Sequence, residues 1–406
     1  IMKKFNKVLS VVVASAMVMA MAGCGNTDNG SAATGTNAAT ESAAADNGAA
    51  SGSVFKIGGI GPTTGGAAVY GLAVQHGAEI AVEEINAAGG INGYQVEFKF
   101  QDDEADAEKS VNAYNALKDW GAQVLDGSTT SGACIAVTDK TKEDNMFQIT
   151  PSGSAVECVQ YDNNFRVCFS NPNQGLASAQ YIGENGLAEK IAVIYDSSDV
   201  YSSGIYEKFV KEAENQPFEV VAAEAFTADN KTDFSVQLQK AKDAGADMVF
   251  LPIYYQESAL ILTQAAAMGY APKWFSCDGM DGILGGVDNF DVSLTEGVML
   301  LTPFAADATD DLTQSFVTKY KEKYGETPNQ FAADSYDAIY VIKAAIEKSG
   351  VTPDMSVSDI CDGMKAAMTE ITVDGLTGNG MTWTADGEAN KAPKAVVIEN
   401  GAYKAM

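Results

Sequence analysis

Histidine and positive charge are both scarce in this 406-residue chain. His76 is the only histidine, and neither an HExxH nor a GxxxxGK[ST] motif occurs. Only one imidazole group is therefore available for a histidine-based catalytic triad or a structural zinc site. Lys and Arg number 26 against 54 Asp and Glu, which gives a formal net charge of -28. Such a chain repels a phosphate backbone, so we expect no nucleic-acid partner. Because catalytic and metal-binding groups are sparse, we also expect no enzyme activity and no cofactor.

The N-terminal region has the organisation of an export signal. Three lysines precede an apolar run over residues 8–22, which is too short to span a bilayer with flanks. The run ends in Met21-Ala22-Gly23-Cys24, which resembles a bacterial lipobox, where the Cys becomes lipidated. We therefore predict a lipoprotein signal peptide over residues 1–24, lipidation of Cys24, and an extracytoplasmic protein anchored to the bacterial cell membrane. Residues 25–53 have no aromatic or large aliphatic side chain, which predicts a disordered tether.

The remaining cysteines lack CxxC spacing, and they are Cys134, Cys158, Cys168, Cys277 and Cys361. Export permits disulfides, and Cys158 and Cys168 are the nearest pair in sequence. Free, buried thiols are the alternative.

After the tether, apolar runs of strand length alternate with helical patterns. The expected strands are 54–60, 95–101, 123–126, 146–150, 165–169, 190–196, 219–226, 247–252 and 297–301, and the expected helices are 72–86, 107–120, 134–143, 206–214, 234–244, 258–267, 311–324, 330–348 and 356–368. This alternation predicts an α/β fold with parallel sheets. Residues 118–134 and 242–258 repeat one pattern: a helix stopped by Gly, a strand, and a polar loop. Because ligands bind beyond the carboxyl ends of parallel strands, two such loops predict two lobes that face one cleft.

Polar loops after strands supply the candidate ligand-binding residues. Ser128–Ala133 and Thr150–Ser154 offer hydroxyls, and the first opens a helix, an arrangement that favours a carboxylate; N-capping is the alternative. Asp278 follows a short apolar run, where it could face an ammonium group or serve as a turn residue. Tyr201, Tyr254 and Tyr255 also follow strand ends.

Two other motifs are not interpreted as binding sites for a dinucleotide or a metal ion. The Gly58–Gly66 loop is rich in glycine, but its spacing is wrong for a dinucleotide and Pro62 removes a donor. The acidic residues 102–106 lack calcium-loop spacing, so we predict a polar turn and no metal site.

From Phe55 onward, the order of motifs resembles the branched-chain (leucine/isoleucine/valine) amino acid binding proteins of ABC importers, which are type I periplasmic binding proteins. The resemblance lies in Ile57–Pro62 with Gly65, in Gly77-Ala78 through Glu84–Gly93, in Thr130-Ser131-Gly132, in Thr150-Pro151-Ser152 and in Phe165-Arg166. It implies two Rossmann-like lobes joined by three crossover segments. Lobe 1 would comprise residues 54–171 and 303–375, and lobe 2 would comprise 172–302 and 376–406.

The resemblance also implies the role of each site residue. Ser131 with the backbone of Gly132 and Ala133 would hold the ligand carboxylate, assisted by Gly153 and Ser154. The ammonium group would meet Asp278, the Gly153 carbonyl and a tyrosine hydroxyl. The side-chain pocket would have walls formed by Tyr70, Tyr201 and either Tyr254 or Tyr255.

The expected function is therefore capture of a small amino acid, branched-chain or otherwise hydrophobic, and its delivery to ABC permease subunits by a monomer. Two departures leave the ligand open: Ser202 follows Tyr201 where Gly is frequent, and Asp278 is one methylene shorter than Glu. A sensory module, or a receptor for an amide or an aromatic acid, is the alternative.

Overall fold

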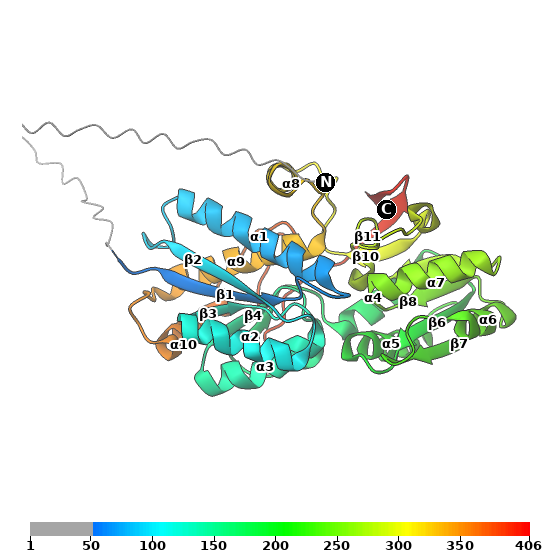
Figure 1. The fold of residues 1–406 in the computed structure, drawn as a ribbon, viewed down its shortest axis with the longest axis horizontal. Coiled ribbons are helices and arrows are strands. Elements are labelled where there is room, and N and C mark those ends of the chain that lie inside the picture. The colour runs from blue at the N-terminus through cyan, green and yellow to red at the C-terminus, as the bar shows by residue number, and fades with distance from the viewer. Residues whose placement is uncertain (1–51) are drawn as a thin grey trace, which may run out of the picture. The chain divides into compact units, whose positions relative to one another are not determined.

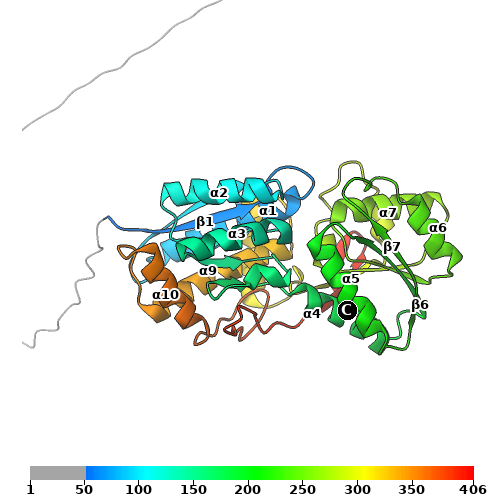
Figure 2. The ribbon, with the colours of Figure 1, turned by 90° about the horizontal axis from the view of Figure 1, so that it is seen from below.

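The computed structural model describes residues 52–406, so Cys24, the predicted signal peptide and residues 25–51 of the predicted tether lie outside the described residues. The described chain contains two sheets, and helices cover both faces of each (Figures 1 and 2). We call the sheet β1–β5 with its helices lobe 1, and the sheet β6–β12 with its helices lobe 2. The predicted α/β fold with two parallel-rich lobes is confirmed.

Lobe 1 contains a five-stranded parallel sheet in the order β2-β1-β3-β4-β5. The strands are β1 (Phe55–Gly61), β2 (Val96–Asp102), β3 (Val124–Asp126), β4 (Phe147–Thr150) and β5 (Asn164–Arg166). The helices are α1 (Ala68–Ala87), α2 (Ala107–Trp120), α3 (Ser131–Asp144), α8 (Asp311–Tyr324), α9 (Gln330–Ser349) and α10 (Val357–Met368), with the short 3₁₀ helix η1 (Val156–Val159). Helices α1 and α9, which are far apart in sequence, pack side by side on one face of the sheet, and α2 and α3 cover the other (Figure 1).

Lobe 2 contains a seven-stranded sheet in the order β12-β11-β10-β9-β8-β6-β7, in which only β11 and β12 run antiparallel to their neighbours. The strands are β6 (Lys190–Asp196), β7 (Glu219–Phe226), β8 (Met248–Leu251), β9 (Lys273–Ser276), β10 (Met299–Thr302), β11 (Lys394–Glu399) and β12 (Ala402–Ala405). The helices are α4 (Asn171–Glu184), α5 (Val200–Ala213), α6 (Ser235–Asp243) and α7 (Tyr255–Ala267), with the 3₁₀ helices η2 (Asp278–Met280) and η3 (Val292–Thr295).

The strand sequences are apolar because both faces of each sheet are buried. In β6, Ile191 and Val193 pack into the cluster formed with α4 and α5, whereas Ala192 and Ile194 belong to the core that includes α6 and α7. All four side chains are fully buried. Parallel sheets covered on both faces read as continuous apolar runs, which explains why the strand pattern was visible in the sequence.

The chain passes between the two sheets after β5, after β10 and before β11. The last passage is long. Within it, the Trp383 Nε1–H donates to the Arg166 carbonyl at 2.8 Å, and the Arg166 N–H donates to the Gly387 carbonyl at 3.0 Å, so residues 383–387 lie against β5. The lobe boundaries at 171, 303 and 375 stay a prediction.

Within residues 52–406, no helix is long and apolar enough to cross a bilayer.

Candidate functional site

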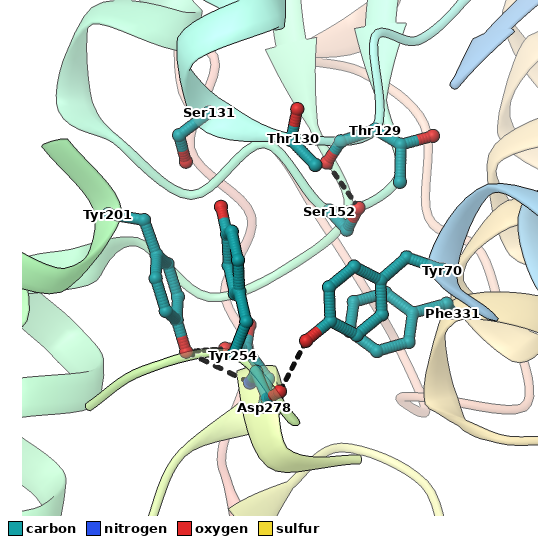
Figure 3. A pocket seen from close by; sticks show the side chains of 10 residues that line it. Tyr70, Thr129, Thr130, Ser131, Ser152, Tyr201, Tyr254, Asp278 and Phe331 are labelled. Carbon is teal, nitrogen blue, oxygen red and sulfur yellow. Dashed lines mark hydrogen bonds between the residues drawn. The ribbon is translucent and has the colours of Figure 1, made fainter. Parts of the chain in front are cut away.

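A small pocket, with a cavity volume of about 20 Å³, is lined by residues of both lobes just beyond the carboxyl ends of β3, β4, β8 and β9. Figure 3 shows Thr130, Ser131 and Ser152 on one side and Asp278 on the other, with the rings of Tyr201 and Tyr254 between them. The ten lining residues are Tyr70, Thr129, Thr130, Ser131, Ser152, Tyr201, Tyr254, Asp278, Gly279 and Phe331. This is the place where open parallel sheets bind their ligands.

The lobe 1 wall is the N-terminus of α3, which presents unpaired donors. Thr130 is the N-cap residue, its side chain makes no capping hydrogen bond, and its buried hydroxyl has no partner. The N–H groups of the first helical turn have no intrahelical acceptor. The Ser131 hydroxyl accepts hydrogen bonds from the N–H groups of Ser154 (3.1 Å) and Ala155 (3.2 Å), and its own proton can be donated to the Ser154 hydroxyl at 3.4 Å or to a ligand. Such a wall suits a carboxylate.

The lobe 2 wall contains one buried carboxylate, Asp278, whose side-chain partners are neutral. The Tyr201 hydroxyl donates to Oδ1 at 2.6 Å and the Gln174 amide donates to Oδ2 at 2.8 Å. Burial raises the pKa of Asp278 to about 7, and the two hydrogen bonds only partly oppose this effect. No cationic side chain of residues 52–406 forms an ion pair with it. The site therefore carries a carboxylate that an ammonium group would stabilise.

Aromatic rings form the rest of the pocket. The rings of Tyr201 and Tyr254 stack with centroids 5.0 Å apart, and Tyr70 meets Tyr254 edge to face at 5.4 Å. Phe331, at the start of α9, packs on Tyr70 at 4.4 Å. The Tyr201 hydroxyl also accepts from the Gly279 N–H at 2.9 Å. Such a wall is apolar on its faces and suits an aliphatic or aromatic ligand body.

Half of the predicted site residues line this pocket, namely Tyr70, Ser131, Tyr201, Tyr254 and Asp278. Tyr254 is a lining residue, whereas Tyr255 is buried and packs on Tyr70 with centroids 5.2 Å apart; which of the two meets the ligand stays a prediction. The other four predicted residues, Gly132, Ala133, Gly153 and Ser154, are not among the lining residues. Gly132 and Ala133 belong to the first turn of α3, and Ser154 donates to Ser131, so their contribution stays a prediction. The Gly153 carbonyl accepts a hydrogen bond from Arg166 at 3.2 Å.

Sequence reasoning missed five lining residues and one partner of Asp278. Thr129, Thr130 and Ser152 belong to the two loops that the sequence had indicated, and Gly279 follows Asp278 directly. Phe331 and Gln174 lie on α9 and α4, far away in sequence, and no local pattern marks them.

The cysteines and the histidine lie outside the pocket lining. All five cysteines of residues 52–406 are free and buried, so the disulfide considered between Cys158 and Cys168 is not formed. Cys158 packs instead against Cys134 of α3. His76 of α1 stacks on Tyr324 with centroids 3.7 Å apart, its Nδ1 lies 3.3 Å from the Tyr320 hydroxyl, and burial lowers its pKa.

Two α/β lobes with a pocket between their strand ends define a two-lobed solute-binding protein. The chain matches the periplasmic binding protein family over residues 54–402, and it belongs to that family. The predicted resemblance is confirmed. Leu/Ile/Val-binding protein homolog 3 of Brucella melitensis is 31% identical over 300 residues, which are 73% of this chain and 80% of the relative. The leucine-, isoleucine-, valine-, threonine-, and alanine-binding protein of Pseudomonas aeruginosa is 30% identical, with 73% and 79% covered.

Solved structures agree with the type I fold. The branched-chain amino acid transporter substrate-binding protein LivJ of Streptococcus pneumoniae, in complex with isoleucine, matches with a TM-score of 0.78 and 28% identity, covering 87% of this chain and 99% of LivJ. A solute-binding protein of Rhodopseudomonas palustris in complex with benzoate has a TM-score of 0.76 at 20% identity, covering 87% and 95%, and it shows the fold alone. The family consists of solute-binding proteins of the extracytoplasmic space.

Proposed function

We propose that this protein binds a small α-amino acid between its lobes and delivers it to the permease of an ABC importer. The observation that carries this proposal is the pairing, across one pocket, of a helix N-terminus with free donors and a buried carboxylate. A zwitterion satisfies both at once: its carboxylate meets Ser131 and the first turn of α3, and its ammonium group meets Asp278. The ligand's side chain then lies against the aromatic wall. Relatives named for leucine, isoleucine, valine, threonine and alanine support an amino acid of this size.

The protein performs no chemistry in this proposal. Asp278 is the only lining residue with an ionisable carboxyl group, and the pocket contains no histidine or cysteine to act as its partner in catalysis. Burial explains the raised pKa of Asp278, so the shift does not require a catalytic role.

A ligand screen tests the proposal. Calorimetric titration with the twenty amino acids should give saturable binding for at least one small hydrophobic member. The matched probes for leucine are 4-methylpentanoate, which lacks the ammonium group, and 3-methylbutylamine, which lacks the carboxylate. Both should bind far more weakly, because each leaves one wall unpaired. Benzoate is also included in the screen. If benzoate binds and no amino acid binds, the ligand class would be an aromatic acid in place of an amino acid.

The location proposed is the outer face of the cell membrane, with Cys24 lipidated and the following residues acting as the tether. Cys24→Ala should release the protein into the medium or block its processing, as detected by fractionation and by mass analysis of the N-terminus. Cys361→Ala, which changes a cysteine buried in lobe 1, is the matched control and should leave membrane attachment unchanged. Normal processing and full membrane retention of Cys24→Ala would exclude the lipid anchor.

A further inference from the structure

A short segment of lobe 2, from Asp278 to Gly286, docks directly on lobe 1. Tyr70, near the start of α1, reaches across the pocket, and its hydroxyl donates to the Gly279 carbonyl (Figure 3). The same hydroxyl accepts from the Tyr255 N–H at 3.2 Å. Tyr70 is 2% exposed. Its hydroxyl is therefore used by two backbone groups of the opposite lobe.

A second residue of lobe 1 binds the same segment. Gln330 is the first residue of α9, and its side-chain amide donates to the Asp278 carbonyl at 3.0 Å. Its backbone N–H donates to Oδ2 of Asp281 at 2.9 Å. Two helices of lobe 1, α1 and α9, thus bind the neighbouring backbone carbonyl groups of Gly279 and Asp278.

Glycine allows this close approach. A Cβ at Gly282 would come within 2.5 Å of the Val69 side chain, and one at Gly286 within 2.6 Å of it. Gly282 also has a φ of +105°, which other residues rarely adopt. The docked segment fits α1 because side chains are absent at these two positions.

We propose that the Tyr70 hydroxyl and the Gln330 amide form a latch that holds the two lobes together around the ligand by gripping the backbone that carries Asp278. This inference rests on the proposed function, since it concerns the same pocket. When the lobes separate, water replaces the partners of all these groups, so the bonds contribute only to the closed state. The Asp278 side chain contacts the ligand while its carbonyl contacts lobe 1. Ligand recognition and closure are consequently joined in one residue.

The latch gives the Tyr70 hydroxyl a role other than contact with the ligand. In Tyr70→Phe the ring keeps its packing on Tyr254 and Phe331, and only the two bonds across the cleft are lost. The buried Gly279 carbonyl and Tyr255 N–H are then unpaired in the closed state but hydrated in the open state. A loss of about fivefold to thirtyfold in affinity is expected, on the scale of one or two buried hydrogen bonds.

The test uses Tyr70→Phe and Gln330→Met, with Tyr114→Phe as the matched control. Tyr114 is equally buried, and its hydroxyl bonds Asp144 inside lobe 1. The probe is whichever of the twenty amino acids binds the wild type most tightly. For both latch variants we expect faster dissociation with a nearly unchanged association rate, and at equal ligand occupancy a larger radius of gyration by small-angle scattering. Their thermal midpoint without ligand should stay that of the wild type, whereas Tyr114→Phe should lower the midpoint and leave the dissociation rate unchanged.

The outcomes separate the latch from the proposed function. If the wild type binds and closes but both variants retain its dissociation rate and its closed radius, the latch is wrong and the binding function stands. Slower association with unchanged dissociation would also overturn the latch, since it would place the two groups on the ligand's entry path. A wild type that binds none of the twenty amino acids would overturn the proposed function, and the latch with it.

Discussion

The two walls of the pocket differ in how strongly they destabilise the protein when no ligand is bound. On the lobe 1 wall, the Ser131 hydroxyl already accepts two backbone N–H bonds and the donors of α3 are uncharged. On the lobe 2 wall, Asp278 is 5% exposed and has only neutral partners, and burial raises its pKa to about 7. In the proposed complex, the ligand ammonium group would relieve this electrostatic cost on lobe 2, whereas the ligand carboxylate would only add hydrogen bonds on lobe 1. Substitutions on lobe 2 should have the larger effects.

The largest effect is expected for Asp278→Ala. Removal of one side of a buried charge pair commonly costs about 2–5 kcal/mol of binding free energy, because the ligand ammonium group is left unpaired. Titration with leucine and with 4-methylpentanoate checks the assignment: the wild type should discriminate strongly between them, and Asp278→Ala should lose much of that discrimination. Asp288→Ala is the control, since Asp288 is an exposed acid of the same lobe. Equal discrimination by wild type and Asp278→Ala would remove Asp278 from the ammonium site.

Asp278 and Ser131 could be predicted because each follows a strand end in a short polar loop. The strands β1 to β8 and β10 also lay within a few residues of their expected positions, since buried parallel strands have a strong local pattern. Helix α4 was missed because Asn171-Pro172-Asn173 reads as a loop and few large aliphatic residues follow, although the proline occupies a position in the first turn where it is tolerated.

The latch could not be predicted from the sequence. Gln330 and Phe331 meet Asp278 and Tyr70 only because α9 returns to lobe 1 beside α1, and this contact depends on how the two lobes meet. No local sequence pattern in either segment predicts this contact. The bond from Gln174 to Asp278 lies within lobe 2, but it joins the start of α4 to the end of β9, and these segments are far apart in sequence.

The next largest effect is expected from pH. With the lobes closed and no ligand bound, burial raises the pKa of Asp278 to about 7, and a bound ammonium group should lower that pKa, so we expect the ionised form to bind the ligand preferentially. Affinity should be highest above pH 7 and should fall as the pH drops through 7, with a limiting slope of about tenfold per pH unit and a loss approaching a hundredfold at pH 5. Calorimetry across this range, in buffers of different ionisation enthalpy, should also detect proton release on binding near pH 7.

Asp278→Asn is the control for the pH profile. It should bind weakly at every pH and lose the slope between pH 8 and 5. The folded-state pKa of Asp278 is raised above its unfolded value, so ionisation of the carboxyl group destabilises the free wild type progressively as the pH rises from about 4 to about 7. At pH 8 the variant should therefore have the higher thermal midpoint, and this difference should shrink as the pH falls toward 4. A wild-type slope that survives in Asp278→Asn would assign the titration to another group.

The smallest effect is expected for Ser131→Ala on the lobe 1 wall. The substitution removes one hydroxyl donor to the ligand carboxylate but leaves the backbone donors of α3, so we expect a loss of about 1–2 kcal/mol of binding free energy. It also removes the acceptor of the Ser154 and Ala155 N–H groups, so the thermal midpoint without ligand must be measured beside the affinity. Ser131→Thr restores a hydroxyl and should recover part of the lost affinity. If Ser131→Ala weakened binding as much as Asp278→Ala, the two walls would be energetically equivalent, and the contrast between a neutral and a charged wall would not govern ligand affinity.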